Sequence, residues 1–326
     1  MKSIIQLAVY LLAPLLVLAD EGFVIRGKVT GIVSGYVSVD PHRHEGEASE
    51  EVWPERVRIV NGEFVFKGKV DHPELVRLKI STRTVDLLLE NAEYTVAGDF
   101  QSLNGRAFKG GLMNEQFWAF IMSGKPFMEY IEANPYNEVA PFLAHKYAKR
   151  REEAEKAYGL LSLSGRGSWH GQLLAERIAN YKKTAAGKPV PDFIMTDPSG
   201  RKFSMASLKG ATVVLDFWAS WCAPCRAYIP KMRELYNKYR DRNVVFVAVS
   251  FDEKDDEWRK AMSELNMEWM QGLVDGGFKD GSPVKKLFGI TSIPHVVVVG
   301  PDGNVAESLD FYNKERLPGI LEKLAG

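Results

Sequence analysis

The chain has very little cysteine. Among its 326 residues only Cys222 and Cys225 are cysteines, and both lie in the segment Trp221-Cys222-Ala223-Pro224-Cys225. This scarcity excludes a framework of structural disulfides, which would need several pairs spread along the chain. The pair is not required as a staple, because closing so short a loop removes little chain entropy. The two thiols therefore indicate a redox pair or half of a metal site.

An excess of charge of either sign is also absent. Lysine and arginine number 42, and aspartate and glutamate also number 42. A balanced chain has no long-range field to attract nucleic acid or an anionic membrane surface. We therefore expect proteins or small molecules as partners, and no nucleic acid. The length favours at least two structural units.

No apolar run reaches the roughly 20 residues that a membrane-spanning helix needs. The longest begins at Ile4 and ends at Leu18, after Lys2. Val17 and Ala19 have the small-residue spacing that signal peptidases accept, so residues 1–19 are predicted to be a secretory signal peptide cleaved after Ala19. Asp20, rather than a cysteine, would follow the cut, which does not suit a lipid anchor. A retained N-terminal anchor is the alternative.

Residues 20–110 show short runs in which apolar and polar side chains alternate, as in Phe23 to Val29. Asn61-Gly62 between two such runs is a two-residue hairpin signal. An antiparallel β-sandwich or barrel-like domain is predicted here. Residues 111–186 change to helical runs and are predicted to form a helical connector, with helices at 114–121, 139–158 and 172–183.

Residues 187–326 alternate strands with helices. The pattern predicts an α/β domain with a mixed sheet, with strands at 211–218, 244–249, 296–299 and 304–309, helices at 225–239 and 256–265, and a last helix opening near Asn313.

Cys222 follows an apolar strand and is expected to open the next helix. Unpaired amide donors and the positive end of the helix dipole favour a thiolate there, so we expect the pKa of Cys222 to lie below that of a free thiol. Cys225 lies one turn further into the helix and is expected to be better shielded. It is placed to attack a mixed disulfide formed by Cys222.

Several motifs together resemble thioredoxin-fold domains of the TlpA/ResA type, the exported thiol-disulfide oxidoreductases. The resemblance covers about residues 190–324. It rests on Pro191-Asp192-Phe193, Ser207-Leu208-Lys209-Gly210, the block from Val213 to Arg226 that contains Cys-Ala-Pro-Cys, Pro230, Phe288-Gly289-Ile290 and Ile293-Pro294.

The resemblance implies a role for each matching residue. Cys222 would be the attacking thiol and Cys225 the resolving thiol. Pro294 would be a cis-proline facing the disulfide, and the backbone of Ile293 would pair with an extended substrate segment. Asp216 matches a buried aspartate that assists proton transfer and that close exported relatives often replace with asparagine; burial would raise its pKa.

Trp221 and Pro224, on either side of Cys222, are expected to shape substrate access. His295 departs from the threonine that many relatives carry after the cis-proline; it either tunes the thiolate or packs, and we favour packing or solvent exposure. The alternative for Asp216 is a satisfied carboxylate without a catalytic duty. Phe217 and Trp218 are expected to be core residues.

The N-terminal stretch resembles the β-rich domain of unknown function that precedes thioredoxin-like domains in exported Bacteroidetes proteins. The matching runs are Val60 to Gly68 and Leu89-Glu90-Asn91. No activity comes with this resemblance. A docking role, or a homodimer formed through this domain, is suggested by its position alone.

The family resemblance implies a periplasmic enzyme that reduces or exchanges disulfides in exported client proteins, without a cofactor. An upstream membrane thiol donor and a place in cytochrome c maturation are implied as well. The alternatives are a metal-binding or noncatalytic docking protein and, third, a thiol peroxidase. A zinc site wants four ligands where this chain has one cysteine pair, and the His42-X-His44 pair lies in a polar loop typical of a solvated segment.

Overall fold

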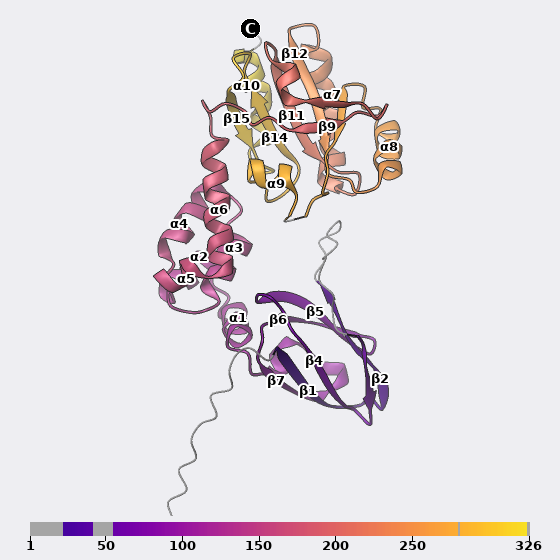
Figure 1. Ribbon diagram of the computed structural model, residues 1–326, viewed down its shortest axis with the longest axis vertical. Helices are drawn as coiled ribbons and strands as arrows, with labels where there is room; N and C mark the ends of the chain where they lie inside the picture. Colours follow the sequence, from indigo (N-terminus) through magenta and orange to yellow (C-terminus); the bar gives the residue numbers. More distant parts are fainter. Residues whose placement is uncertain (1–21, 42–54, 280, 325–326) are drawn as a thin grey trace, which may run out of the picture. The chain divides into compact units, whose positions relative to one another are not determined.

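The computed structural model describes residues 22–41, 55–279 and 281–324, which divide into two units (Figure 1). Among the described residues, the first unit consists of 22–40 and 55–118, and the second consists of Pro41 and the residues from Ala119 onward. The expected signal peptide and the His42–His44 pair lie outside the described residues. Within the described ranges, no helix has the length and apolar character needed to cross a membrane.

The first unit is built on one eight-stranded sheet with the order β6-β5-β2-β3-β4-β1-β7-β8. Most neighbouring strands with a defined register are antiparallel, but β1 and β7 run parallel. The strands are β1 (Phe23–Thr30), β2 (Ser34–Pro41), β3 (Val57–Val60), β4 (Glu63–Gly68), β5 (Glu74–Ile80), β6 (Arg83–Leu89), β7 (Glu93–Asp99) and β8 (Phe108–Lys109).

Alternation in the sequence places one face of this sheet in a core. In β1, Phe23 and Ile25 are fully buried and Val29 nearly so, while the side chains between them are more exposed. The expected hairpin is present: Asn61 and Gly62 have φ angles of 50° and 78°, and Val60 pairs with Glu63. A Cβ on Gly62 would lie 2.2 Å from the Val29 carbonyl oxygen, so glycine is required at this turn.

Asn91, in the run Leu89-Glu90-Asn91, closes a loop of the first unit. Its side-chain oxygen accepts a hydrogen bond from the Val70 amide at 3.0 Å, and its side-chain nitrogen donates to the Val70 carbonyl at 2.7 Å. Glu90 accepts from the Met113 amide at 2.8 Å, at the start of α1 (Leu112–Ser123). The run Leu89-Glu90-Asn91 therefore has a structural role.

The second unit begins with a group of short helices. These are α2 (Phe127–Ala133), α3 (Ala140–Tyr147), α4 (Arg151–Leu160), α5 (Leu163–Gly167) and α6 (Trp169–Lys183). The single helix expected over 139–158 is wrong, because the chain leaves helical geometry at Ala148, where ψ is 89°, and becomes helical again only at Arg151. The Lys149 carbonyl between the two helices instead accepts hydrogen bonds from the hydroxyls of Tyr181 and Thr291 at 3.1 and 3.0 Å.

A seven-stranded mixed sheet follows, with the order β10-β9-β13-β12-β11-β14-β15. Strands β11, β12 and β13 run parallel, and β14 and β15 continue the sheet antiparallel. The elements are β9 (Ile194–Thr196), β10 (Lys202–Ser204), β11 (Thr212–Trp218), α7 (Ala223–Tyr239), β12 (Val244–Ser250), α8 (Asp255–Glu264), β13 (Met270–Leu273), α9 (Pro283–Phe288), β14 (His295–Val299), β15 (Val305–Leu309) and α10 (Leu317–Leu324).

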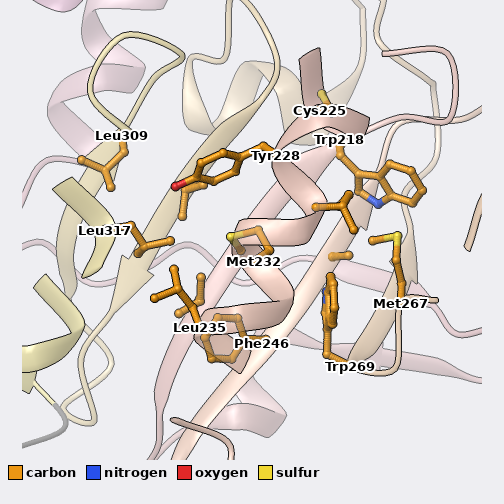
Figure 2. Close-up of a cluster of buried hydrophobic side chains, with 14 of the residues drawn as sticks. Trp218, Cys225, Tyr228, Met232, Leu235, Phe246, Met267, Trp269, Leu309 and Leu317 are labelled. Atoms are coloured by element: carbon orange, nitrogen blue, oxygen red, sulfur yellow. The ribbon is translucent and has the colours of Figure 1, made fainter. Parts of the chain in front are cut away.

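Helices cover both faces of this sheet. Val214 and Trp218 of β11 share one buried cluster with side chains of α7, α8 and α10 (Figure 2). Val213, Leu215 and Phe217 share the cluster on the other face with Val284 and Phe288 of α9. This arrangement confirms the predicted fold class, a thioredoxin-like mixed sheet flanked by helices and preceded by a β-rich domain. Phe217 and Trp218 are core residues, as expected.

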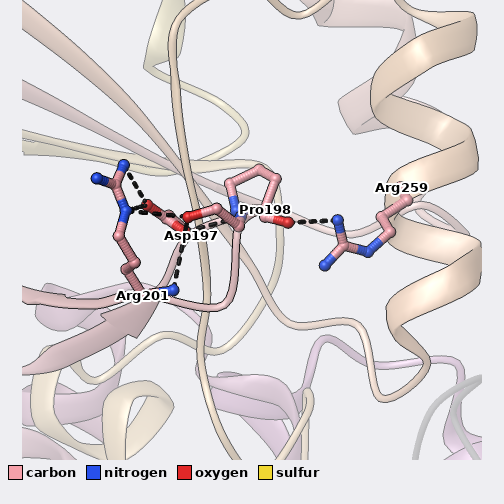
Figure 3. A network of polar contacts seen from close by, with 5 residues as sticks. Asp197, Pro198, Arg201 and Arg259 are labelled. Carbon is pink, nitrogen blue, oxygen red and sulfur yellow. Dashed lines mark hydrogen bonds and ion pairs between the residues drawn. The ribbon is translucent and has the colours of Figure 1, made fainter.

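The strands β9, β10 and β13 were not anticipated, because runs of three or four residues give no clear periodicity. The turn between β9 and β10 is held by Asp197, whose carboxylate accepts from the Ser199 and Arg201 amides at 2.8 and 3.0 Å. Figure 3 shows how Arg259 of α8 reaches the Pro198 carbonyl in the same turn.

Candidate active site

Cys222 and Cys225 are joined in a disulfide at the beginning of α7. Strand β11 ends at Trp218, and the Cys222 amide donates to the Ala219 carbonyl at 3.1 Å, which turns the chain sharply. Cys222 is the N-cap residue of α7, and its Sγ accepts a hydrogen bond from the Cys225 amide at 3.2 Å. A sulfur that accepts from a free helix amide is stabilised as a thiolate, which is the setting the sequence predicts.

The two cysteine residues differ little in exposure while they are bonded to each other. Cys222 is 4% exposed and Cys225 2% exposed, although the sequence suggested an open attacking sulfur and a shielded partner. Both belong to the buried cluster that fills the α7 face of the sheet. Around them, Trp221 is partly exposed and Pro224 is exposed.

Asp216 lies beneath this junction, in the fully buried strand β11. It is 3% exposed and sits between Val214 and Trp218, so its side chain points to the same sheet face as α7. Burial raises the pKa of Asp216 to about 7. The pKa of Tyr228, on α7, is raised by burial first and then by the charges of Glu315 and Asp216, which places this carboxyl near the helix.

The Ile293–Pro294 peptide bond is cis. Strand β14 begins directly after it, and His295 pairs with Phe217 near the end of β11. Pro294 is buried, and the partly buried Ile293 packs against the cluster that contains both cysteines. The cis peptide and the disulfide therefore lie at the same end of the sheet.

His295 packs on the opposite face of the sheet from the cysteines. The ring centroids of His295 and Phe217 lie 6.3 Å apart, and Phe217 belongs to the buried cluster on the sheet face that α9 covers. Its Nε2 forms a hydrogen bond with Ser308 Oγ at 2.9 Å. Burial lowers the pKa of His295 to about 4, against an opposing effect of the Asp310 charge, so the ring is neutral at physiological pH. Packing, the favoured alternative, accounts for this residue.

Asp252 was missed by the sequence reasoning, although it stands at the carboxyl end of β12, beside the end of β11. Its buried carboxylate accepts from the Ser220 amide at 3.1 and 3.0 Å, from Ser220 Oγ at 2.6 Å and from Ser250 Oγ at 2.6 Å. Ser220 precedes Trp221 and Cys222, so Asp252 fixes the turn that delivers the redox pair. The run Ser250-Phe251-Asp252 after an apolar strand was the available signal.

Aromatic side chains continue from Trp221 along a loop between β13 and α9. The ring of Phe278 lies 6.0 Å from that of Trp221 and 5.4 Å from that of Phe251. Lys285 Nζ lies 4.4 Å from the centre of the Phe278 ring. Trp221 is thus held by packing on one side while part of it stays accessible.

The helices before the sheet also contact the segment that leads into the cis-proline. Tyr181 of α6 packs over Gly289, where a Cβ would lie 2.8 Å from its ring, and Thr291 donates to the Lys149 carbonyl. Both contacts lie within five residues of Pro294. In the part of the chain that the structure describes, no group of three or more His, Cys, Asp or Glu side chains gathers as a metal site would require.

Comparison with known proteins identifies two domains. Residues 210–305 match a family model described as thioredoxin-like, and residues 23–117 match one described as a domain of unknown function, DUF4369. The thiol-disulfide oxidoreductase ResA of Bacillus thuringiensis (strain Al Hakam) is 31% identical over 148 residues, which are 45% of this chain and 83% of that protein. ResA of Bacillus subtilis (strain 168) is 25% identical over 130 residues, 40% of this chain and 70% of that protein.

Solved structures similar to this chain include the thioredoxin domain of a thiol-disulfide oxidoreductase from Bacteroides vulgatus. It is 29% identical with a TM-score of 0.38, and the match covers 44% of this chain and 99% of that domain. A thiol-disulfide oxidoreductase from Bacteroides fragilis NCTC 9343 is 25% identical with a TM-score of 0.39, over 42% of this chain and 99% of that protein.

Asp252→Ala is expected to loosen the turn before Cys222. It leaves the Ser220 amide and the two serine hydroxyls without their acceptor, which costs about 2–4 kcal/mol of stability. The thiolate of reduced Cys222 would then be held less well, so alkylation by iodoacetamide at pH 7 slows. Asp252→Asn keeps an oxygen for the Ser220 amide and retains most of the alkylation rate.

The control is Asp256→Ala, an exposed carboxylate on α8, which leaves stability and alkylation unchanged. Equal losses in Asp252→Asn and Asp252→Ala would show that charge, rather than hydrogen-bond geometry, is responsible. Wild-type alkylation in Asp252→Ala would remove Asp252 from the positioning of the turn.

The buried Asp216 is expected to make the oxidised protein less stable as pH rises. An unfolded aspartate ionises near pH 3.9, whereas folded Asp216 keeps its proton up to about 7. Between these values the unfolded state binds fewer protons, so the free energy of unfolding falls by up to about 4 kcal/mol in total. Urea unfolding of Asp216→Asn, compared with wild type at pH 4.5 and 7.5, isolates this effect.

Between about pH 4 and 6.5, His295 makes the folded protein more stable as pH rises, because its pKa is lowered in the folded state. This contribution cancels in the comparison, because both proteins contain His295. The free energy of unfolding of Asp216→Asn should therefore increase relative to that of wild type as pH rises. A constant stability difference between the two proteins at both pH values would contradict the raised pKa of Asp216.

Proposed function

Because this chain belongs to the ResA family of thiol-disulfide oxidoreductases, we propose that it reduces or exchanges disulfides in exported client proteins by cycling Cys222 and Cys225 between dithiol and disulfide. The observation that carries the proposal is the pair itself: one sulfur caps the helix, and the other lies within bonding reach one turn further on. No other cysteine in the sequence competes for either one.

In the first step, the Cys222 thiolate attacks one sulfur of the client disulfide. A Cys222–client bond forms, the client S–S bond breaks, and the released client thiolate takes a proton from water. The amide of Cys225, which donates to Cys222 Sγ, is placed to stabilise the attacking thiolate before the bond forms.

In the second step, Cys225 loses its proton and attacks Cys222 Sγ, so the internal disulfide forms and the second client thiolate leaves. We propose that Asp216 accepts the proton of Cys225, directly or through water. Asp216 then gives this proton to the client sulfur as that sulfur leaves. A pKa of about 7 leaves this carboxyl divided between its two forms at neutral pH, which suits a group that accepts and returns a proton. The client gains two electrons, and the protein loses two.

Client binding is assigned to the surface around the pair. The backbone of Ile293, before the cis Pro294, would pair with an extended client segment, as edge strands do in strand addition. Trp221 and Pro224 flank Cys222 and present apolar surface to that segment. The partial exposure of Ile293 and Trp221 supports these roles.

We further propose that the chain works in the periplasm, with residues 1–19 removed as a signal peptide. The basic residue, apolar run and small-residue spacing at its N-terminus support this. The proposed organisation is a β-rich domain over 20–110, a helical connector over 111–186 and the thioredoxin-like domain over 187–326. A membrane thiol donor would return two electrons to the Cys222–Cys225 disulfide. The client proteins would include those of cytochrome c maturation. The β-rich domain would dock a partner or form a homodimer.

The redox assignment predicts distinct behaviour for the two serine variants. Cys222→Ser lacks the nucleophile, so its acceleration of insulin reduction by dithiothreitol falls to background, as measured by turbidity. Cys225→Ser still attacks but cannot resolve, so it accumulates a mixed disulfide with insulin that non-reducing electrophoresis and mass spectrometry locate at Cys222. Wild-type activity in Cys222→Ser, or no trapped insulin in Cys225→Ser, would refute the assignment.

Proton transfer by Asp216 predicts a pH-dependent resolution rate. In wild type, the rate at which a mixed disulfide with glutathione resolves should rise as pH passes through about 7, where the carboxyl becomes a base. Asp216→Asn should resolve at least about tenfold more slowly at pH 7.5. Stopped-flow measurement from pH 5.5 to 8.5 tests this, with Asp241→Asn, an exposed carboxylate just beyond the other end of α7, as control. Equal rates for Asp216→Asn and wild type across this range would leave Asp216 without a proton-transfer role.

A further inference from the structure

Two large aromatic side chains are exposed side by side just after β15. Phe311 is 40% exposed and Tyr312 is 75% exposed, and their ring centroids lie 5.3 Å apart in an edge-to-face arrangement. They belong to residues 310–313, here called the aromatic loop. Single exposed apolar residues are common on protein surfaces, whereas two adjacent exposed aromatic side chains form a small apolar patch.

Hydrogen bonds within the segment stabilise this loop. The Asp310 carboxylate accepts from the amides of Tyr312 and Asn313 at 2.9 and 3.2 Å. Lys314 Nζ donates to the Phe311 carbonyl at 2.9 Å and lies 4.1 Å from the centre of the Phe311 ring. The two aromatic rings are therefore presented by an ordered turn, which lowers the entropy lost when a partner binds them.

The sheet register places the aromatic loop at the same end as the redox pair. Leu309, the last residue of β15, pairs with Val296, two residues after the cis Pro294. His295 in turn pairs with Phe217, one residue before the end of β11, from which the chain runs to Cys222. Since adjacent strands lie about 4.8 Å apart, the end of β15 is about 10 Å across the sheet from the end of β11.

Tyr228 connects the loop to the helix that carries the cysteines. Its hydroxyl donates to the Lys314 carbonyl at 3.1 Å, and Lys314 Nζ lies 5.2 Å from the centre of its ring. Tyr228 shares the buried cluster with Cys225, one turn before it on α7, and Figure 2 shows its ring reaching toward Leu309. Lys314 thus lies against the exposed ring of Phe311 and against the buried ring of Tyr228, which is one turn from Cys225 on α7.

The charged side chains at and beside the loop have local partners, and the Asp310 carboxylate is engaged by the two backbone amides of the loop. Arg316 pairs with Glu307 at 2.9 Å, and the ammonium of Lys314 is occupied with Phe311 and lies 3.8 Å from Glu315. A charged partner would find little unpaired charge to meet, whereas an apolar side chain would cover two aromatic faces. The surface therefore suits an apolar partner.

We propose that the aromatic loop binds apolar side chains that flank the reactive cysteine of a client protein. The inference rests on the proposed function, because a disulfide that reaches Cys222 brings its neighbouring residues over this end of the sheet. Phe311 and Tyr312 then select, among protein disulfides, those set in apolar sequence. A small hydrophilic disulfide reaches Cys222 without touching them.

The test compares three oxidised substrates: glutathione disulfide, and the disulfide-linked dimers of two short peptides whose cysteine is flanked by leucines or by serines. Reduced wild-type protein should react faster with the leucine peptide than with the serine peptide. Phe311→Ala and Tyr312→Ala should each lower kcat/KM for the leucine peptide by about 3- to 10-fold, the range expected when one aromatic contact is lost. Rates with the serine peptide and with glutathione disulfide should stay at wild-type values.

Tyr136→Ala is the matched control, since Tyr136 is 83% exposed and lies in the turn between α2 and α3. Tyr312→Ser provides a second variant that leaves the contact between Lys314 and Phe311 in place. Wild-type rates on the leucine peptide in both loop variants would overturn the proposal, as would an equal loss on all three substrates. If the wild-type protein reduces none of the three, the proposed function itself fails, and this result is distinct because it appears without any substitution.

Discussion

The site depends on one junction, between the end of the buried strand β11 and the start of helix α7, which Cys222 caps. The strand is held on both sides by β12 and β14, so its end cannot shift without breaking the sheet. The helix is held by a large buried cluster that includes Tyr228, Met232 and Leu235. Between these two elements only four residues turn the chain, and the amide of Cys225 donates to the sulfur of Cys222. Reactivity at sulfur is therefore a property of the packing of the whole unit.

Two buried carboxylates flank this junction, and their surroundings give them different tasks. Asp252 accepts hydrogen bonds from three donor groups, which satisfy a carboxylate and make it a mechanical tie. Asp216 lies in an entirely buried strand, where burial raises its pKa to about 7 and keeps a proton within reach of the helix. The same type of side chain thus anchors a turn at Asp252 and, in the function we propose, exchanges a proton at Asp216, and the number of nearby hydrogen-bond donors distinguishes the two.

The sequence identified the features that lie within one contiguous motif. The strand, the turn and the helix around Cys222 follow from periodicity and spacing, and the family resemblance pointed to Asp216 and to the cis bond at Pro294. The roles of Asp252 and the aromatic loop were not predicted, because their neighbours in space are set by strand register rather than by distance along the chain. The break between α3 and α4 escaped for a similar reason, since the carbonyl of Lys149 finds its donors at Tyr181 and Thr291, far along the chain. Helical periodicity carries no information about such long-range partners.

The bonds to the Lys149 carbonyl also bear on where the redox module begins. A family match over residues 210–305 suggests a module that could be excised. However, Thr291 donates to the Lys149 carbonyl, well before that match begins, and the Tyr181 ring packs over Gly289. A fragment that begins at residue 187 would keep both cysteines and every strand of this sheet, but it would expose Gly289 and leave the Thr291 hydroxyl without the Lys149 carbonyl. The helices before the sheet thus pack against the segment that precedes the cis-proline. The N-terminal boundary of the family match therefore leaves out residues that contact the redox module.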